Sequence, residues 1–385
     1  MADGRTPGFA TRAVHAGQEP DPETGAVVPP IHLATTFRQD AVGETRGYEY
    51  SRTDNPTRRR LEACLASLEG AQHCVAFASG LAATTTLLLL LEPGDHVVFT
   101  DDVYGGTFRL FDAVLRRFSL TFTAVDATDT GAVDAACTDR TRLVWLESPT
   151  NPLLRVVDIG AVAERAHERG ATVCVDSTFA SPVLQRPLEL GADVVLHSTT
   201  KYLGGHSDVV GGAVLTSDDG IAERLRFHQN AVGAVPSPFD CWLLLRGLRT
   251  LELRVRRQCD SASTIARWLR EHPRVQRVHY PGLDDHPGHT LAARQMHGAY
   301  GGVVSFEVES GDLARNVLRR LRIFALAESL GAVESLAESP AMMTHASVPE
   351  EQRRKVGVGD GLIRLSIGVE DVDDLIGDLD QALDA

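Results

Sequence analysis

The chain's 385 residues are 43% hydrophobic and 23% charged, and its formal net charge at pH 7 is −14. These values are typical of a globular protein, and the length favours two domains because single cores seldom grow beyond about 300 residues. The negative charge argues against a nucleic-acid-binding protein, since that function begins with a basic surface.

The N-terminal stretch "MADGRTPGFATR" contains no apolar run of the kind found in a signal peptide. The longest apolar run, residues 81–91, is too short to span a bilayer. The six cysteines form no C-x-x-C pair, and several lie in apolar runs, which is typical of buried, reduced thiols. We therefore predict a cytoplasmic protein that binds no membrane.

Residues 1–55 show no sustained hydrophobic period, yet "PPIHLATTF" and "YEYSR" carry many apolar and aromatic groups. A disordered tail has fewer of them. We predict an extended arm that lies on another surface, such as a second subunit.

From residue 56 onwards, short β-rich runs alternate with helical stretches. The predicted strands are 73–77, 96–100, 120–125, 142–147, 171–176, 192–197 and 211–215. The predicted helices between them include 55–69, 80–91, 105–117 and 158–169. Buried strands that alternate with helices predict an α/β fold whose mainly parallel, seven-stranded sheet is covered on both faces.

A long amphipathic stretch, roughly 239–270, interrupts this alternation. It predicts the link into a smaller α+β unit, with strands near 275–279, 302–308 and 363–367. The predicted organisation is an arm, an α/β domain and a C-terminal α+β domain over residues 1–55, 56–250 and 251–385.

Polar residues follow the predicted strands at their carboxyl ends, where open parallel sheets bind ligands. "ASGLAAT" follows the first strand and is either a phosphate-binding turn or a simple helix cap. "DDVYGGTFR" offers Tyr104 and Arg109, and "ESPTNP" offers Glu147 and Asn151. Asp176 ends a later strand, where a helix N-cap is the alternative.

Lysine is rare in this chain, since only Lys201 and Lys355 are lysines among 38 basic residues. A partly buried lysine can become a neutral nucleophile, which arginine cannot. Lys201 follows Asp176 by one βα unit. An amine, a carboxylate, an aromatic ring and an anion site on one rim suit pyridoxal 5'-phosphate (PLP), whose aldehyde needs an amine and whose ring nitrogen needs a carboxylate.

Motifs along nearly the whole chain resemble the Cys/Met-metabolism PLP enzymes of fold type I. In chain order they are "YSRTDNPT", "ASGLAAT", "DDVYGGTFR", "ESPTNP", "VDSTFASP", "STTKYLGGHSDVVGG", "AESLGAVESL", "MTHAS" and "IRLSIGVE". The resemblance implies the PLP-dependent transferase fold and γ-elimination on an amino acid such as cystathionine, in transsulfuration. It leaves open γ-replacement on an activated homoserine ester, and elimination from methionine or another γ-substituted amino acid.

The resemblance also implies a role for each matching residue. Lys201 would bind the cofactor's aldehyde and remove the Cα proton. Tyr104 would stack on the ring and, with a pKa lowered by neighbouring cations, protonate the leaving sulfur. The other residues of the cofactor site would be Asp176, Thr178, Gly80, Leu81, Ser198 and Thr200. Tyr50 and Arg52 would reach the phosphate from a neighbouring subunit, in a homotetramer built from two active dimers.

The residues implied for the amino-acid substrate are Arg364, Ser329 and Asn151 at its α-carboxylate, Arg109 and Glu328 at its far end, and Glu147. A guanidinium fork has the right shape for a carboxylate. Two positions depart from the family pattern: Ser177 stands where Asn is usual, and Ala332 where Gly is usual. We expect both to flank the pocket.

Three other classes of function are disfavoured. A nicotinamide oxidoreductase needs a G-x-G-x-x-G turn, which "FASGLAAT" is not. A metal site at His197, His206 and Asp208 lacks a supporting H-x-x-x-H or C-x-x-C array. A non-catalytic binding protein would be expected to have lost Lys201 or Asp176.

Overall fold

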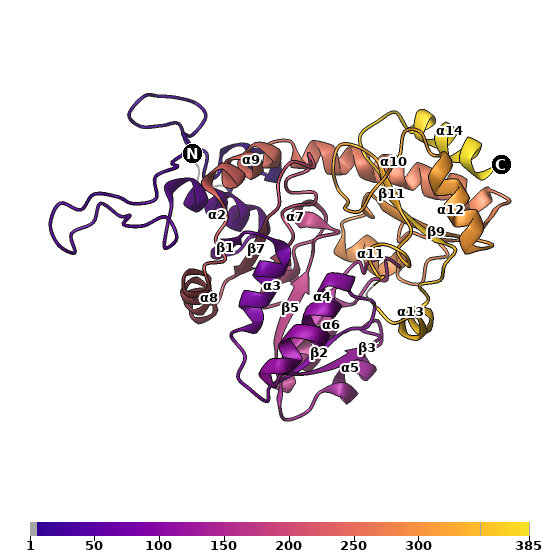
Figure 1. Ribbon diagram of the computed structural model, residues 1–385, viewed down its shortest axis with the longest axis horizontal. Helices are drawn as coiled ribbons and strands as arrows, with labels where there is room; N and C mark the ends of the chain where they lie inside the picture. Colours follow the sequence, from indigo (N-terminus) through magenta and orange to yellow (C-terminus); the bar gives the residue numbers. More distant parts are fainter. Residues whose placement is uncertain (1–5, 347, 385) are drawn as a thin grey trace.

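The computed structural model describes residues 6–346 and 348–384 (Figure 1). The first five residues of the predicted arm and Ser347, the last residue of "MTHAS", lie outside the described residues.

The larger sheet has seven strands in the order β1-β7-β6-β5-β4-β2-β3. The strands are β1 His73–Phe77, β2 His96–Thr100, β3 Thr121–Val125, β4 Thr141–Glu147, β5 Thr172–Asp176, β6 Val194–His197 and β7 Gly212–Thr216. All neighbours pair in parallel except β7, which is antiparallel to both β1 and β6. The predicted α/β class with a mainly parallel sheet of seven strands is confirmed.

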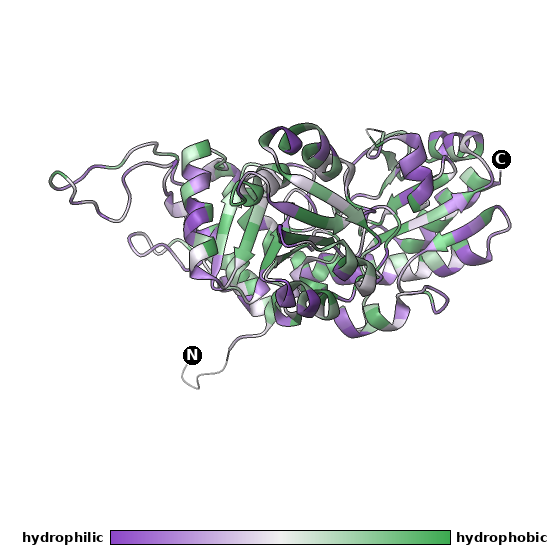
Figure 2. Cartoon of the chain, turned by 90° about the horizontal axis from the view of Figure 1, so that it is seen from below, coloured by the Kyte–Doolittle hydropathy of each residue, from purple (hydrophilic) through white to green (hydrophobic). Residues whose placement is uncertain are grey.

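Helices bury both faces of this sheet, as Figures 1 and 2 show. On β4, Trp145 packs on one face with Phe111, while Val144 and Leu146 pack on the other face with Val162. Because successive side chains point to opposite faces, a strand buried on both sides reads as a continuous apolar run. The helices are α2 Pro56–Glu69, α3 Gly80–Leu88, α4 Gly105–Arg109, α5 Thr130–Ala136, α6 Ile159–Glu168, α7 Ser181–Leu184 and α8 Asp219–Val232.

One predicted helix and the predicted amphipathic link are interrupted. The stretch predicted at 105–117 consists of α4, a π-helical turn at Leu110–Val114 and a 3-10 turn at Leu115–Phe118. The amphipathic stretch predicted as one unit at 239–270 is two helices, α9 Pro238–Leu248 and α10 Leu251–Glu271. The chain breaks there because the Gly247 carbonyl accepts bonds from Thr250 N–H, Thr250 Oγ1 and Arg254 Nη2.

The C-terminal part forms a second sheet of five strands in the order β10-β11-β12-β9-β8. Its strands are β8 Val275–His279, β9 Val303–Val308, β10 Ala325–Leu326, β11 Leu336–Glu338 and β12 Leu362–Ser366. Its helices are α11 His289–Gln295, α12 Gly311–Arg320, α13 Glu350–Val356 and α14 Val372–Leu383. A separate apolar core lies between this sheet, α10, α12 and α14. The predicted boundaries at 55/56 and 250/251 stay predictions.

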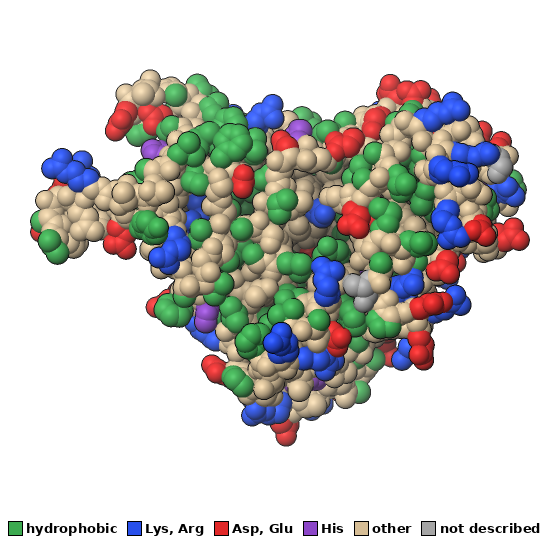
Figure 3. All heavy atoms as spheres, viewed as in Figure 1, with side chains coloured by type: hydrophobic (Ala, Val, Ile, Leu, Met, Phe, Trp, Pro, Cys, Tyr) green, Lys and Arg blue, Asp and Glu red, His purple; other side chains and the backbone are tan. Residues whose placement is uncertain are grey.

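The N-terminal segment contains one short helix, α1 Phe9–His15, and then runs without regular structure up to α2. Its loops project from the body of the molecule (Figures 1 and 3). Several of its apolar side chains are exposed, among them Val27, Leu33 and Val42.

Two further features concern membrane-spanning helices and the state of the cysteines. In the described ranges, no helix has the length and apolar character needed to cross a membrane. None of the six cysteines is in a disulfide; Cys137 is half-buried and the other five are buried.

Candidate active site

A cavity of about 400 Å³ opens at the carboxyl ends of β1, β4, β5 and β6 and is closed on the other side by segments of the smaller sheet. It brings together most of the residues predicted from the sequence. Those that line it are Gly80, Leu81, Tyr104, Glu147, Asn151, Asp176, Thr178, Ser198, Thr200, Lys201, Glu328, Ser329 and Arg364. A larger cleft of about 850 Å³, between Arg155 and Arg277, contains none of them.

Lys201 lies in the turn after β6, with its amine inside the cavity. Its Nζ donates a hydrogen bond of 2.8 Å to Ser329 Oγ. Burial, and then the positive charge of Arg364, lower the pKa of Lys201 to about 8 from its ordinary 10.5, while Glu338 and Glu328 oppose the change. A substantial fraction of this amine is therefore neutral near neutral pH, as a nucleophile or base must be.

Asp176 and Glu147 end two neighbouring parallel strands and stand opposite each other in the register. Asp176 Oδ1 accepts bonds from Thr178 N–H at 3.1 Å and Thr178 Oγ1 at 2.5 Å. Burial is the main reason why the pKa of Asp176 is raised. Glu147 Oε2 accepts from Tyr104 N–H at 3.0 Å. Asp176 has no hydrogen-bonded cation in the described part of the chain.

The start of α3 forms an anion cradle beside Ser198. Ser79 caps this helix by accepting a bond from Ala82 N–H, and the other N–H groups of the first turn have no intrahelical acceptor. A Cβ on Gly80 would lie only 3.1 Å from Ser198 Cβ, so the cradle needs glycine for its close approach. Thr200 Oγ1 both donates to and accepts from the backbone of Gly211.

These features fit PLP on physical grounds. The half-buried Asp176 carboxylate suits the protonated nitrogen of a pyridine ring, and the first turn of α3 suits a phosphate. Lys201 offers an amine of lowered pKa in the same cavity. One molecule that carries a cation, a phosphate and an aldehyde around a single ring satisfies all three groups.

Tyr104 corrects one expectation. Its pKa is raised, because burial outweighs the nearby positive charge of Arg109, and Glu328 raises it further. The expected lowering by cations is therefore wrong for this structure. The phenol is 37% exposed and keeps its proton at neutral pH. Arg109 lies close enough to act on Tyr104 but does not line the cavity.

Arg364 on β12 is held on three sides. It stands opposite Glu338 of β11, and the two buried side chains form an ion pair of 2.9 Å. Its Nη1 also donates to Asn151 Oδ1 at 2.8 Å, and its Nη2 donates to the Ser329 carbonyl at 2.9 Å. Thr344 Oγ1 donates to Glu338 Oε1 at 2.7 Å. The sequence reasoning missed Glu338, because a strand of three residues shows no recognisable pattern.

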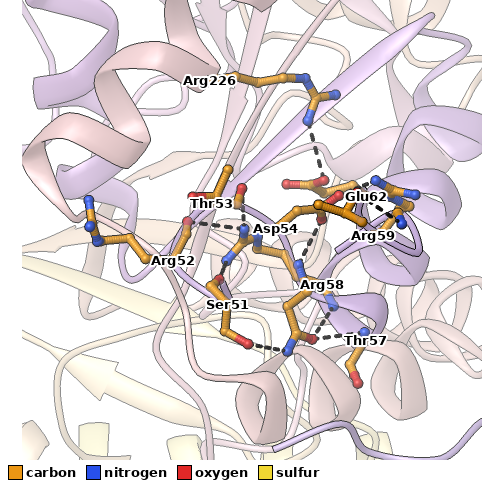
Figure 4. Close-up of polar contacts among 12 residues, drawn as sticks. Ser51, Arg52, Thr53, Asp54, Thr57, Arg58, Arg59, Glu62 and Arg226 are labelled. Atoms are coloured by element: carbon orange, nitrogen blue, oxygen red, sulfur yellow. Dashed lines mark hydrogen bonds and ion pairs between the residues drawn. The ribbon is translucent and has the colours of Figure 1, made fainter. Parts of the chain in front are cut away.

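Tyr50 and Arg52 do not line the cavity of their own chain. Arg52 Nη1 donates to the Asn230 carbonyl at 2.8 Å, and its guanidinium lies over the Tyr50 ring. The buried Arg58 fixes their loop by donating to the carbonyl groups of residues 51–53 (Figure 4). Both residues are exposed, and their predicted role across a subunit interface stays a prediction.

Ser177 and Ala332, the two departures from the family pattern, do not line the cavity. Ser177 is fully buried and lies near Gln185 Nε2, and the Ala332 carbonyl accepts a bond from Gln258. Ser177 lies between Asp176 and Thr178, which both line the cavity, so the expectation that the two positions flank the pocket stays a prediction. In the described ranges, no three His, Cys, Asp or Glu side chains are placed to hold a metal ion; His197 instead pairs with Glu69.

Comparison with known proteins identifies one family, and the relatives found are named for several different activities. The sequence model of the family described as "Cys/Met metabolism PLP-dependent enzyme" matches residues 10–384. A cystathionine gamma-synthase of Mycobacterium bovis is 56% identical over 379 residues, which cover 98% of this chain and 97% of that protein. A cystathionine gamma-lyase of Dictyostelium discoideum is 54% identical over 378 residues, with the same coverage. A cystathionine beta-lyase of Coxiella burnetii is 53% identical over 377 residues, covering 97% of each.

A solved structure shows the same fold. The cystathionine gamma-lyase from Lactobacillus plantarum, complexed with L-serine, superimposes with a TM-score of 0.95 at 47% identity, over 98% of this chain and 99% of that chain.

Proposed function

The chain belongs to the Cys/Met metabolism PLP-dependent enzymes, and on that basis we propose that it catalyses γ-elimination on L-cystathionine. The products are L-cysteine, 2-oxobutanoate and ammonia. The observation that carries the proposal is that one cavity is lined by two opposite charges besides Lys201 and Asp176, the cation Arg364 and the acid Glu328, with Arg109 near Tyr104. Cystathionine has an amino-acid group at each end, so it matches both.

PLP, when bound, supplies a ring that accepts the electron pair left on Cα after its proton departs. Lys201 is the base for that proton, because its lowered pKa leaves part of it neutral. Ser329 Oγ, 2.8 Å from Nζ, holds the amine in place. Asp176 would pair with the ring nitrogen, and Thr178 keeps the Asp176 carboxylate oriented.

Arg364 is the residue that would bind the substrate's α-carboxylate. The buried Glu338 and the Ser329 carbonyl hold its guanidinium in one orientation, so little entropy is lost when the carboxylate binds. Asn151 fixes the same guanidinium from the side of the larger sheet. The carboxylate then fixes which Cα–H bond faces the amine.

Tyr104 is the acid for the leaving sulfur. A phenol whose pKa is raised by burial holds its proton at neutral pH, which is the state a proton donor needs. Glu328 and Arg109 act on this end of the cavity, where the second amino-acid group of cystathionine would lie.

The assembly belongs to the same proposal. We place Tyr50 and Arg52 at the phosphate of a neighbouring subunit's site, in a homotetramer of two active dimers. Support comes from Arg58, which fixes their loop, and from the exposed apolar side chains of the arm, among them Val27 and Leu33. Figure 3 shows hydrophobic side chains gathered over α9 next to the arm, where Phe239 is 47% exposed.

A second candidate is γ-replacement, in which cysteine captures an activated homoserine ester to form cystathionine. The 56% identity to the gamma-synthase favours it, since it exceeds the 54% identity to the gamma-lyase. The residues at PLP and at the α-carboxylate would serve both reactions equally.

The deciding experiment compares products from two incubations of the purified enzyme with PLP. Cysteine and 2-oxobutanoate from cystathionine alone support the proposal, whereas homocysteine and pyruvate would make the protein a β-lyase. Cystathionine formed only from an activated homoserine ester and cysteine would establish the synthase.

Lys201→Ala should abolish turnover and retain the fold, whereas Lys355→Ala, which alters the only other lysine, should retain turnover. Substantial turnover in Lys201→Ala would refute the mechanism.

A further inference from the structure

Glu147 and Asp176 form a pair of carboxyl groups inside one cavity. They end β4 and β5 and stand directly opposite each other in the strand register. Glu147 is only 3% exposed, and both side chains line the cavity wall. Paired residues on neighbouring strands point to the same face of the sheet, so the negative charge of one carboxyl opposes ionisation of the other. Ionisation of one carboxyl therefore favours a proton on the other.

The surroundings favour the anion on Asp176. Thr178 donates two hydrogen bonds to its Oδ1, which lower the pKa of Asp176 against the effect of burial. Hydrogen bonds donated to a carboxylate stabilise its ionised state.

The surroundings of Glu147 are of the opposite kind. Its Oε1 is buried and has no hydrogen-bond partner in the described ranges. Burial, followed by the charge of Asp176, raises the pKa of Glu147 well above its ordinary value. Asp102, from the segment after β2, adds to this, and only the backbone N–H groups of Tyr104 and Asn151 oppose it. No cationic side chain is among these strongest influences on Glu147.

We propose that Glu147 is a neutral carboxylic acid in the folded protein and serves as a positioning residue, which holds Tyr104 at the cavity and leaves Asp176 as the anion of the pair. This replaces the substrate-binding role expected from the sequence, and it rests on the proposed PLP-dependent function. The proton lies on Oε1, because Oε2 accepts the Tyr104 N–H bond. One acid thereby connects the residue expected to stack on the ring with the residue expected to pair with its nitrogen.

The first test uses the full-length apoprotein and Glu147→Gln, which is isosteric and carries no charge. A carboxyl whose pKa is raised by folding keeps its proton above pH 4.5 while the unfolded chain releases it. Stability therefore falls as pH rises from 4.5 until the folded pKa is passed. We expect the wild-type unfolding midpoint to fall relative to that of Glu147→Gln between pH 5 and pH 8. Parallel curves over this range would overturn the proposal.

The second test measures the protonation of Glu147 and its positioning of Tyr104 separately. Infrared difference spectra of the apoprotein at neutral pH should contain a protonated-carboxyl band that Glu147→Gln removes and the control Glu328→Gln retains. PLP affinity should change less than about threefold in Glu147→Gln, which keeps an acceptor for the Tyr104 N–H, and fall at least about tenfold in Glu147→Ala. An equal loss in both variants would overturn the positioning role. Neither readout needs a substrate, so failure of the proposed reaction is recognised separately.

Discussion

The lowered pKa of Lys201 predicts how the apoprotein captures PLP as pH is varied. The change from 10.5 to about 8 corresponds to about 3.4 kcal/mol, at 1.36 kcal/mol per pKa unit. At pH 7 the neutral fraction of the amine is then about one tenth, roughly 300 times that of an ordinary lysine. Because folding lowers this pKa, the charged amine destabilises the folded protein below pH 8, and the free energy of unfolding should rise between pH 8 and pH 10.5, where the folded amine is neutral and the unfolded one is still charged.

The assay is stopped-flow absorbance of PLP added to the apoprotein between pH 6 and pH 10. The rate constant for covalent capture should rise about tenfold per pH unit up to about 8 and then level off. A blocked lysine derivative, measured in parallel, corrects for the titration of PLP itself and should keep rising toward 10.5. Glu328→Gln should move the inflection a few tenths of a unit lower, because Glu328 raises this pKa, and Arg109→Gln should not move it. A wild-type rate that still rises through pH 9.5 would refute the reasoning.

Further predictions concern the phosphate end of the cavity. Gly80→Ala should weaken PLP binding to the apoprotein at least about tenfold in a fluorescence titration, because its Cβ would crowd Ser198 in the cradle. Gly377→Ala, whose Cβ meets open space in α14, is the control and should raise the free energy of unfolding by about 0.5–1 kcal/mol. Arg52→Ala should speed PLP loss on dialysis, whereas the exposed Arg59→Ala should not; equal PLP retention in the two variants would argue against the intersubunit site.

The larger sheet could be predicted from sequence because its strands are buried on both faces. Each reads as a short apolar run, and His73–Phe77 and His96–Thr100 have the bounds that the sequence predicts. The break between α9 and α10 could not be predicted in this way. It arises from bonds that Thr250 and Arg254 donate to one carbonyl, and such competition leaves the hydrophobic period unchanged.

The candidate site, like the fold, could be predicted from the sequence only in part. Asp176 ends one predicted strand and Lys201 follows another, so the rule that ligands bind at the carboxyl ends places both on one rim. Glu338 lies on a strand of three residues and meets Arg364 through a register that no local pattern encodes. The direction of the pKa change at Tyr104 depends on burial set by distant segments, and the sequence shows the cations near it but not that burial.

Four carboxyl groups around the cavity show how one residue type acquires separate functions. Glu338 is buried against Arg364, whose charge opposes the rise that burial gives to the pKa of Glu338, so it serves as the counter-charge of the substrate clamp. Asp176 accepts two hydrogen bonds from a single threonine and has no cationic partner among the described residues. The protonated pyridine nitrogen of PLP would supply that cation. Glu147 receives only backbone N–H groups among acidic neighbours, so it is the one that keeps a proton. Glu328 is exposed, so its charge is solvated and available to a second ammonium group. The partner of each carboxyl, rather than its identity, decides which function it serves.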